Sequence, residues 1–295
     1  MNILLTGASG FIGSSVLKVL SKKKNAKIFA TYRNKKPKIF DNENTKWIKF
    51  DIFKLNDFKF DLKKIDVVVH LAWPYLPDYT TQNHLKKNLN VQKKFISKLV
   101  KFGVKNLFIA STCYEYGFKS GKLLESSIKK PNNSYAISKS LLREYVFNLN
   151  KNNKINLVWG RIFYVYGQNK KRDTLYNVVI NKNKRQEVKI ANNFYRDYLD
   201  VNVLANLIVI LSMLKKNIGE VNLCSGFSIS LKRLVKFFFK INRIKDNVSS
   251  EKKVSDLEAN NFYGDNKKLK NILDKNLRKN EYKKIINSMI KHKKL

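Results

Sequence analysis

The chain is poor in several features, and each shortage excludes a class of protein. Two cysteines in 295 residues cannot form a disulfide framework, so we expect a reducing cytoplasm. Three dispersed histidines and two distant cysteines also offer no metal site. The longest apolar stretch, residues 207–214, is too short to span a bilayer, and Met1 is followed by no basic signal segment or cleavage site. These shortages predict a soluble intracellular protein.

Acidic residues are scarce as well, since Asp and Glu total 22 against 60 Lys and Arg, which gives a net charge of +38. Such an excess can mark a surface for nucleic acid or for an anionic membrane. Here the lysines occur as scattered doublets and not as one basic stripe, and abundant Asn, Ile, Phe and Tyr are typical of an AT-rich genome. We therefore expect neither a specific nucleic-acid partner nor a membrane, although the charge suits an anionic nucleotide cofactor or nucleotide sugar.

Linkers rich in Gly, Ser or Pro and internal repeats are missing, and strand and helix patterns alternate from the first residue. Strands are predicted at residues 3–6, 28–32, 47–50, 67–73, 107–112, 156–163 and 221–224. Helices are predicted at residues 12–21, 84–102, 138–149, 175–180 and 200–214, with short helices over 229–295. This alternation predicts an α/β fold, a Rossmann doubly wound parallel sheet with a smaller mixed, mainly helical C-terminal substrate lobe. The expected Rossmann domain contains residues 1–165 and also residues 197–223, where the chain returns to it. The expected substrate-binding lobe contains residues 166–196 and 224–295.

A glycine-rich loop joins the first predicted strand to the first predicted helix. Gly7 allows a tight turn, Gly10 lets a pyrophosphate approach the backbone, and Gly13 allows close packing of helix on strand. The helix N-terminus then presents free N–H groups and the positive end of its dipole to the phosphates. The loop therefore predicts a bound dinucleotide cofactor. Ser9, Phe11 and Ile12 are also expected to contact the cofactor.

The end of the second predicted strand favours one cofactor over the other. An acidic residue here binds the ribose 2′-hydroxyl of NAD, whereas an arginine accommodates the 2′-phosphate of NADP. The chain has Arg33 and no carboxylate before Asp41, so we expect NADP, with NAD as the alternative. Asp51, which ends the third strand and precedes Ile52, is placed to bind the adenine amino group or else serves as a turn residue.

Tyr135 and Lys139 form a second informative pair, because four residues on a helix bring both side chains to one face. Free tyrosine titrates at about pH 10, and a lysine ammonium together with a nicotinamide cation favours tyrosinate. Thr112 ends the fifth predicted strand, at the sheet edge where ligands bind, and can polarise a substrate oxygen. These three side chains predict proton transfer beside a bound nicotinamide.

Eight short blocks of sequence occur along the chain in an order that is typical of one protein family. They are TGASGFIG at 6–13, HLAW at 70–73, Asn88, STCYEYG at 111–117, PNNSYAISK at 131–139, GRIFYVYG at 160–167, RDYLDVNVLA at 196–205 and VNLCSG at 221–226. Over nearly the whole chain they resemble the extended short-chain dehydrogenase/reductases, the NAD-dependent epimerase/dehydratase type that acts on nucleotide sugars. The resemblance implies that Thr112, Tyr135 and Lys139 are the catalytic triad. It implies cofactor contacts at Leu71, Ala72, Trp73, Tyr135, Lys139, Ile162 and Phe163. It implies substrate contacts at Thr112, Cys113, Tyr114, Tyr164 and Arg196, with Val165 and Asp197 beside the same pocket.

Two departures from the family pattern narrow the implied activity. The 4,6-dehydratases of the family place Asp-Glu directly after the catalytic threonine, whereas this chain has Cys113 and Tyr114, so dehydration is not expected. Trp73 and Pro74 replace the usual small residues after HLA, and a bulky aromatic there reshapes the pocket over the nicotinamide. The LAWP and TCYEYG blocks resemble the branch of dTDP-linked 4-keto reductases and dehydrogenases that form 6-deoxy-talose.

The resemblance therefore implies an oxidoreductase that uses NADP or NAD at C4 of a nucleotide-linked deoxyhexose and reduces a 4-keto sugar or catalyses the reverse. One alternative is a 4-epimerase with tightly bound NAD, against which Arg33 argues. Another is a catalytically silent nucleotide-binding regulator, against which the intact triad argues. A homodimer through the helices at 84–102 and 138–149 is expected from the fold.

Other conspicuous residues are expected to be structural. His70 is expected to pack at a strand end near the cofactor without binding it, and His84 and His292 are expected on the surface. Cys113 has no His or Asp close in sequence to activate it, so a nucleophile is not expected. The run of three phenylalanines at 237–239 is expected in the core of the small lobe and not in a membrane anchor.

Overall fold

The computed structural model of the chain describes residues 1–37, 43–58, 60–168, 174–182, 187–191, 194–245, 247–251 and 261–293. The chain divides into two units. The first contains Met1–Glu115, Lys129–Arg161 and Ala205–Val221, and the second contains Tyr116–Ile128, Ile162–Leu204 and Asn222–Leu295. These boundaries differ from the expected ones in two main places, and two segments of the first unit also end slightly earlier than expected, at Arg161 and Val221 where residues 165 and 223 were expected. Residues 116–128 belong to the second unit, because their strand pairs within it, and the return to the first unit begins at Ala205 and not at residue 197.

A seven-stranded sheet forms the core of the first unit, in the order β12-β7-β5-β4-β1-β2-β3. Its strands are β1 (Asn2–Thr6), β2 (Lys27–Tyr32), β3 (Thr45–Lys49), β4 (Val67–His70), β5 (Asn106–Thr112), β7 (Asn156–Ile162) and β12 (Gly219–Leu223). β1 runs parallel to β2 and β4, β2 runs parallel to β3, and β4 runs parallel to β5. The strand order reverses between β1 and β4, which is where open α/β sheets bind ligands. The predicted Rossmann sheet is confirmed.

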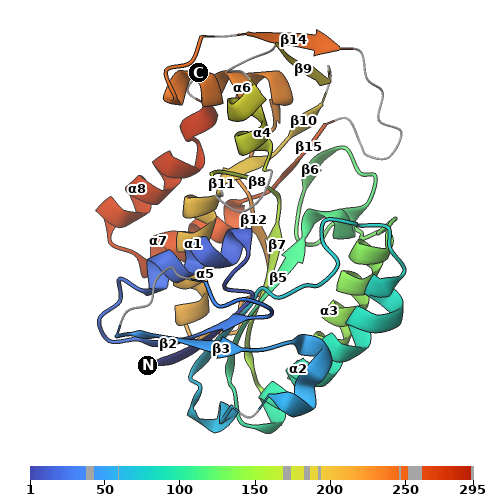
Figure 1. Cartoon of the computed structure of the whole chain (residues 1–295), viewed down its shortest axis with the longest axis vertical. Helices are drawn as coiled ribbons and strands as arrows, with labels where there is room; N and C mark the ends of the chain where they lie inside the picture. Colours follow the sequence, from blue (N-terminus) through green and yellow to red (C-terminus); the bar gives the residue numbers. More distant parts are fainter. Residues whose placement is uncertain are drawn as a thin grey trace. The chain divides into compact units, whose positions relative to one another are not determined.

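Local sequence explains the central strands. Val67, Val68 and Val69 are fully buried, as expected of a parallel strand that is covered on both faces. Figure 1 shows α1 (Phe11–Leu20) and α5 (Val201–Met213) on one side of the sheet and α2 (Leu89–Lys101) and α3 (Ser134–Asn153) on the other. The core around α2 and α3 includes Phe95, Leu99, Leu142, Val146 and Trp159. Short helical turns are η1 (Ile52–Asp57), η2 (Leu62–Lys64), η3 (His84–Asn88) and η4 (Cys113–Tyr116).

The second unit consists of short strands and helices. Its strand pairs are β6 (Gly121–Leu123) with β15 (Phe262–Gly264), β8 (Tyr164–Tyr166) with β11 (Tyr198–Asp200), β9 (Val188–Ala191) with β14 (Val248–Glu251), and β10 (Tyr195–Arg196) with β13 (Ile229–Ser230). Its helical elements are α4 (Leu175–Lys182), α6 (Leu231–Ile241), α7 (Lys267–Asn276), α8 (Lys279–Met289) and η5 (Lys291–Lys293). The sequence predicts helices here but misses most of the strands, because a strand of two to four residues is too short to show a period.

The core of the second unit contains the three phenylalanines of α6, as predicted. His292, predicted on the surface, is buried there too, with its ring stacked 5.0 Å from that of Phe227. That prediction was wrong because η5 packs its histidine inward. Burial lowers the pKa of His292 to about 4, so the ring is neutral.

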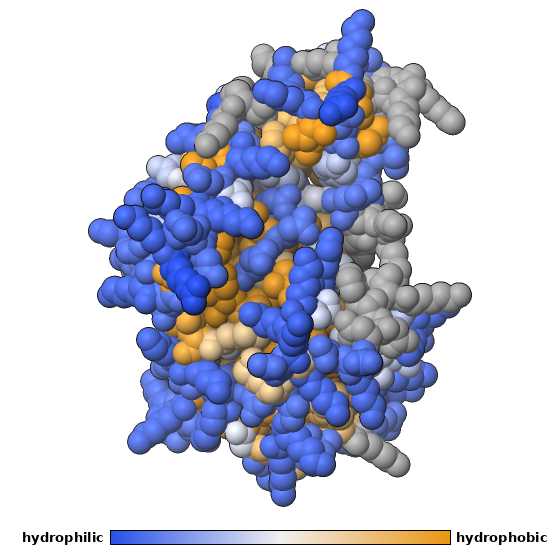
Figure 2. All heavy atoms as spheres, turned by 90° about the vertical axis from the view of Figure 1, so that its left-hand side faces the viewer, coloured by the Kyte–Doolittle hydropathy of each residue, from blue (hydrophilic) through white to orange (hydrophobic). Residues whose placement is uncertain are grey.

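Figure 2 shows hydrophilic side chains over most of the face in view, with apolar patches between them. Within the described ranges, none of the helices has the length and apolar character needed to cross a membrane.

Candidate active site

The turn from β1 into α1 is packed so closely that only glycine fits. Gly7 has a φ of +70°, and the Gly10 N–H donates to the Gly7 carbonyl at 3.0 Å. A Cβ on Gly13 would lie 2.0 Å from that carbonyl oxygen, and a Cβ on Gly7 would lie 2.9 Å from the Ala72 nitrogen. Glycine is therefore required at Gly7 and Gly13 by the packing of the turn itself, as in turns that bind a dinucleotide.

The start of α1 suits an anion. Gly10 caps the helix without a side-chain hydrogen bond, and the first turn carries no acidic residue. Its N–H groups and the positive end of the helix dipole therefore favour a phosphate. Ser9 is exposed in the turn, and Phe11 and Ile12 are half-buried. These residues fit the pyrophosphate of a dinucleotide.

The expected adenosine contacts follow β2 and β3. Arg33 is exposed directly after β2, and Asp41 lies outside the described residues. Asp51 caps η1, where its Oδ1 accepts from the Phe53 N–H at 3.1 Å, so the turn role that the sequence offered as an alternative is present. Ile52 is buried in the core, which leaves only its backbone for a ligand.

Buried hydrogen bonds fix the loop after β4, which supplies the expected cofactor residues Leu71, Ala72 and Trp73. The predicted strand to residue 73 ends at His70, because the N–H groups of Leu71 and Ala72 turn to the Thr6 hydroxyl oxygen at 3.2 and 3.3 Å. The same oxygen lies 2.7 Å from His70 Nδ1. The end of β1 therefore holds the loop beside the glycine turn.

His70 ties this loop to α2. Its Nε2 lies 2.6 Å from Gln92 Oε1, and the Gln92 amide donates to the Ala72 carbonyl at 3.0 Å. Because an amide oxygen only accepts, Nε2 carries the proton and Nδ1 accepts from the Thr6 hydroxyl. Burial lowers the pKa of His70 to about 4, so the ring stays neutral. His70 holds the loop in place, as expected of a structural residue.

β5 and α3 bring the three expected catalytic residues together. β5 ends at Thr112, and the Asn133 side chain caps the start of α3. Tyr135 therefore lies in the first turn of α3, where the Thr112 hydroxyl is close enough to lower the pKa of its phenol. Lys139 follows one helical turn later, and its Nζ donates to the Ala110 carbonyl at 2.7 Å.

Burial sets the proton affinity of this pair, since Tyr135 is 7% and Lys139 4% exposed. It raises the pKa of Tyr135, because tyrosinate would lose its hydration, while the nearby Thr112 hydroxyl acts in the opposite direction. It lowers the pKa of Lys139 to about 7, although the Glu115 carboxylate favours the ammonium form. The tyrosinate expected from the sequence therefore needs the charge of a nicotinamide cation as well as that of Lys139.

Aromatic side chains surround the pair. The Lys139 Nζ lies 3.6 Å from the centroid of the Trp73 ring, and the Trp73 and Tyr135 rings meet edge-on with centroids 5.7 Å apart. The Tyr79 ring lies 5.5 Å from that of Tyr135 and 5.3 Å from that of Tyr114. The bulky aromatic predicted at residue 73 thus touches both Tyr135 and Lys139, and Tyr114 lies at the edge of the same group.

His84 is fully buried beside this group, so its expected surface location was wrong. The Trp73 indole N–H donates to His84 Nδ1 at 3.2 Å, and His84 Nε2 lies 2.7 Å from the Asp78 carbonyl oxygen. The chain from 73 to 84 folds back over the start of α3, where the Tyr135 N–H donates to the Tyr79 carbonyl at 3.0 Å. Such a return has no local signal in the sequence.

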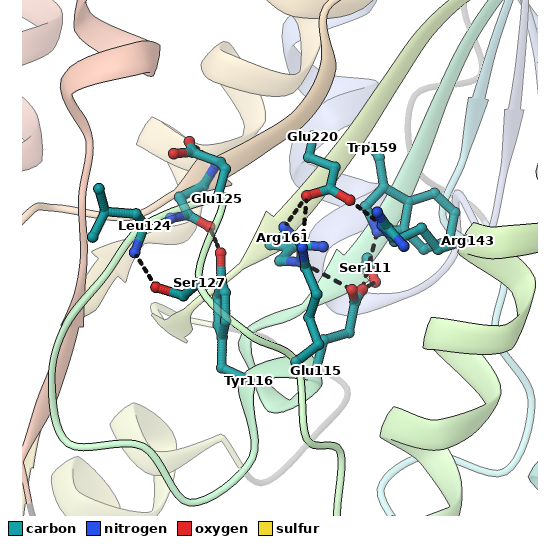
Figure 3. A network of polar contacts seen from close by, with 12 residues as sticks. Ser111, Glu115, Tyr116, Leu124, Glu125, Ser127, Arg143, Trp159, Arg161 and Glu220 are labelled. Atoms are coloured by element: carbon teal, nitrogen blue, oxygen red, sulfur yellow. Dashed lines mark hydrogen bonds and ion pairs between the residues drawn. The ribbon is translucent and has the colours of Figure 1, made fainter. Parts of the chain in front are cut away.

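The sequence also missed a buried charge cluster at the end of β5, drawn in Figure 3. Glu115 is fully buried, and its carboxylate accepts from the Ser111 hydroxyl and, at 3.0 Å, from the Trp159 indole N–H. It pairs with Arg161 of β7 at 2.9 Å, and Arg161 pairs with Glu220 of β12 at 2.8 Å. The available signal was a lone acid in STCYEYG and a lone base in GRIFYVYG, since buried charges of opposite sign need each other.

Glu220 extends this cluster towards the surface. It pairs with Arg143 of α3 and, at 3.4 Å, with Lys129. The charges therefore alternate in sign from the end of β5 to the rim of the first unit. Cys113, an expected substrate contact, is buried at the start of η4.

The remaining expected residues belong to the second unit. The buried Arg196 guanidinium lies 3.7 Å from the Phe194 ring centroid, 4.7 Å from that of Phe262 and 5.6 Å from that of Tyr164. Ile162 and Phe163 are buried, and Tyr164 and Val165 are half-buried.

Asp197, expected beside the substrate pocket, holds backbone segments of the second unit together. Its Oδ1 accepts from the Ser225 N–H and hydroxyl at 2.7 and 2.6 Å, and its Oδ2 accepts from the N–H groups of Gly226 and Gly264 at 2.9 and 3.2 Å. Burial raises the pKa of Asp197 to about 6 despite these bonds. Among the described residues, no three His, Cys, Asp or Glu side chains gather as a metal ion requires.

Comparisons with known proteins show which proteins the chain is similar to. Residues 3–224 match the NAD dependent epimerase/dehydratase family. The chain is 28% identical over 251 residues to dTDP-6-deoxy-L-talose 4-dehydrogenase (NAD(+)) of Aggregatibacter actinomycetemcomitans, which covers 83% of this chain and 92% of that protein. It is 26% identical over 305 residues to GDP-6-deoxy-D-talose 4-dehydrogenase of the same organism, across 99% and 98% of the two chains. The solved structure of UDP-glucuronic acid 4-epimerase from Bacillus cereus in complex with NAD shares the fold, with a TM-score of 0.77 at 22% identity over 100% and 97% of the chains.

Proposed function

The chain belongs to the NAD dependent epimerase/dehydratase family, and on this premise we propose that it is a nucleotide-sugar oxidoreductase that uses NADP or NAD. The reaction is the reduction of a 4-keto sugar at C4 of a nucleotide-linked deoxyhexose, or the reverse oxidation. The proposal is carried by the placement of Thr112 at the end of β5 close to Tyr135 in the first turn of α3, with the buried Lys139 one turn further along the helix. Two relatives that align with most of the chain are named as 4-dehydrogenases of 6-deoxy-talose nucleotides.

Each side chain of the triad has its own task. Tyr135 gives its phenolic proton to the C4 oxygen in the reduction and takes a proton from it in the oxidation. Thr112 donates a hydrogen bond to the same oxygen and holds it near the phenol. The Lys139 ammonium stabilises tyrosinate and binds the nicotinamide ribose. A bound nicotinamide dinucleotide supplies or accepts the hydride at C4.

Dehydration does not fit the residues after Thr112. A 4,6-dehydration removes water and needs an acid and a base beside the sugar, whereas Cys113 and Tyr114 occupy these positions. Cys113 is buried, and Tyr114 packs against Tyr79. This supports redox chemistry at C4 alone.

We propose that Arg33 gives the enzyme a preference for NADP, through its charge next to the ribose 2′-phosphate. The relative named for NAD(+) makes NAD the competing assignment. We expect kcat/KM with NADPH to exceed kcat/KM with NADH. Arg33→Asp should reduce the ratio of these two values at least about tenfold, which corresponds to the free energy of one charge-assisted hydrogen bond. Lys35→Asp makes the same charge change at an exposed neighbour and should leave most of the preference. Equal use of both cofactors by the wild type contradicts the assignment.

The functional test is a panel of dTDP-, GDP-, CDP- and UDP-linked 4-keto and 4-hydroxy sugars, followed through the absorbance of the reduced nicotinamide. Co-purified NAD with sugar turnover and no net absorbance change would instead identify a 4-epimerase.

We also propose that the enzyme is a cytoplasmic homodimer that associates through α2 and α3, where Leu141 is 38% exposed. Light scattering of the purified protein tests this assembly.

A further inference from the structure

The contact between Trp73 and Lys139 is the closest approach of a cation to an aromatic ring in the site. The Nζ lies 3.6 Å from the ring centroid, well within the distance of about 6 Å at which an ammonium is attracted to an indole face. Lys139 is buried, so little water competes for its charge. The contact therefore stabilises the ammonium more than it would at the surface.

The orientation of this indole is fixed from its other edge. The Trp73 N–H donates to His84 Nδ1 at 3.2 Å, so Nδ1 carries no proton and Nε2 does. Nε2 then donates to the Asp78 carbonyl at 2.7 Å. Burial lowers the pKa of His84, which keeps the ring neutral and Nδ1 an acceptor. A chain of directional bonds thus runs from a backbone carbonyl to the ring that faces Lys139.

We propose that Trp73 is a positioning residue that holds the Lys139 ammonium one helical turn from Tyr135, and that His84 fixes the indole for this task. The proposal deepens the proposed function and rests on it, because it explains what favours the charged form of a buried lysine in the site. It also gives a purpose to the aromatic residue that stands where the family usually has a small one.

The other charged and titratable groups around Lys139 come from each neighbouring element. Glu115 follows β5, Tyr135 shares α3, His70 ends β4 and His84 lies in η3. Both histidines have lowered pKa values and are neutral at pH 7, and the tyrosine is protonated, so none of these three adds charge. The Glu115 carboxylate and the indole face are therefore the groups that favour the ammonium.

The test is the titration of Lys139 in cofactor-free protein labelled with carbon-13 at lysine Cε, with Lys139→Met used to assign its NMR signal. The Hε protons of Lys139 should be shifted upfield by the ring current of Trp73. In Trp73→Leu we expect this upfield shift to vanish and the titration midpoint of Lys139 to fall by about one pH unit. This is the effect expected from the loss of a partly desolvated cation–π contact. Trp73→Phe should keep most of both effects, and Trp47→Phe, the same substitution in β3, should change neither.

An unchanged midpoint in Trp73→Leu overturns the proposal. If Trp73→Leu does not fold, the wild type still decides, because an Hε signal of Lys139 without an upfield shift means that the indole does not hold the ammonium. The spectra need no cofactor or sugar, so this result is independent of the reaction. Failure of every nucleotide sugar to react contradicts the proposed function and leaves the measured contact standing.

Discussion

At the scale of single residues, Tyr135 is the group that moves the proton. Tyr135→Phe removes one oxygen and keeps the ring that packs against Trp73 and Tyr79. We expect kcat to fall about 10²- to 10⁴-fold, the usual contribution of a positioned acid or base, while cofactor binding followed by protein fluorescence stays nearly unchanged. Tyr282→Phe makes the same change on α8 and should leave turnover intact. Turnover that survives in Tyr135→Phe means that another group is the acid.

We expect Lys139 to lower the free energy of unfolding, by an amount that depends on pH. Its pKa falls from 10.5 to about 7 on folding because of burial. Below pH 7 the ammonium is charged in both states but desolvated only in the folded one, and between pH 7 and 10.5 the folded state sheds the proton and the cost fades. Stability from this group therefore rises with pH.

Lys139→Met should consequently resist urea better than the wild type at pH 6. The gain is at most about 5 kcal/mol for such a change in pKa, and it should shrink towards pH 9. Lys151→Met replaces an exposed lysine of the same helix and should show no such dependence on pH. A difference in urea midpoint that is the same at both pH values would show that the buried charge is not the cause.

At the scale of secondary-structure elements, the Glu115–Arg161 pair joins the turn after β5 to β7 next to the catalytic residues. Arg161→Met leaves the Glu115 carboxylate buried without its partner, and we expect a loss of about 3–5 kcal/mol in the free energy of unfolding. Lys64→Met breaks an exposed pair with Asp61, whose side chains are 74% and 49% exposed, and should cost no more than about 1 kcal/mol. Similar losses in the two variants, measured by urea unfolding, would contradict the burial argument.

Elements with a strong local pattern were predictable from the sequence, and contacts between distant segments were not. The apolar run of β4 and the glycine turn before α1 showed their structure directly, because period and backbone freedom are local properties. His84 was misplaced because its burial depends on a loop that returns to α3. Glu115 and Arg161 were missed because they are 46 residues apart and pair only in the folded chain.

At the scale of the whole molecule, the sheet explains how the site is assembled. The residues proposed to act on the sugar come from the carboxyl end of β5 and the first turn of α3, and the glycine turn follows β1. Parallel strands bring these ends to one edge of the sheet, which is why a motif order spread over more than a hundred residues predicted a single site. The order of motifs showed the family, whereas the surroundings of Lys139 became visible only in the fold.

The central claim is hydride transfer at C4 of a nucleotide-linked sugar, and one assay tests it most directly. Purified protein is mixed with NADPH and a dTDP-linked 4-keto-6-deoxyhexose, and the absorbance of the reduced nicotinamide is followed while the sugar product is identified. We expect the absorbance to fall as a 4-hydroxy sugar forms, and both changes to be lost in Tyr135→Phe. Absence of any reaction across the panel of nucleotide-linked 4-keto and 4-hydroxy sugars, with either cofactor, would contradict the claim.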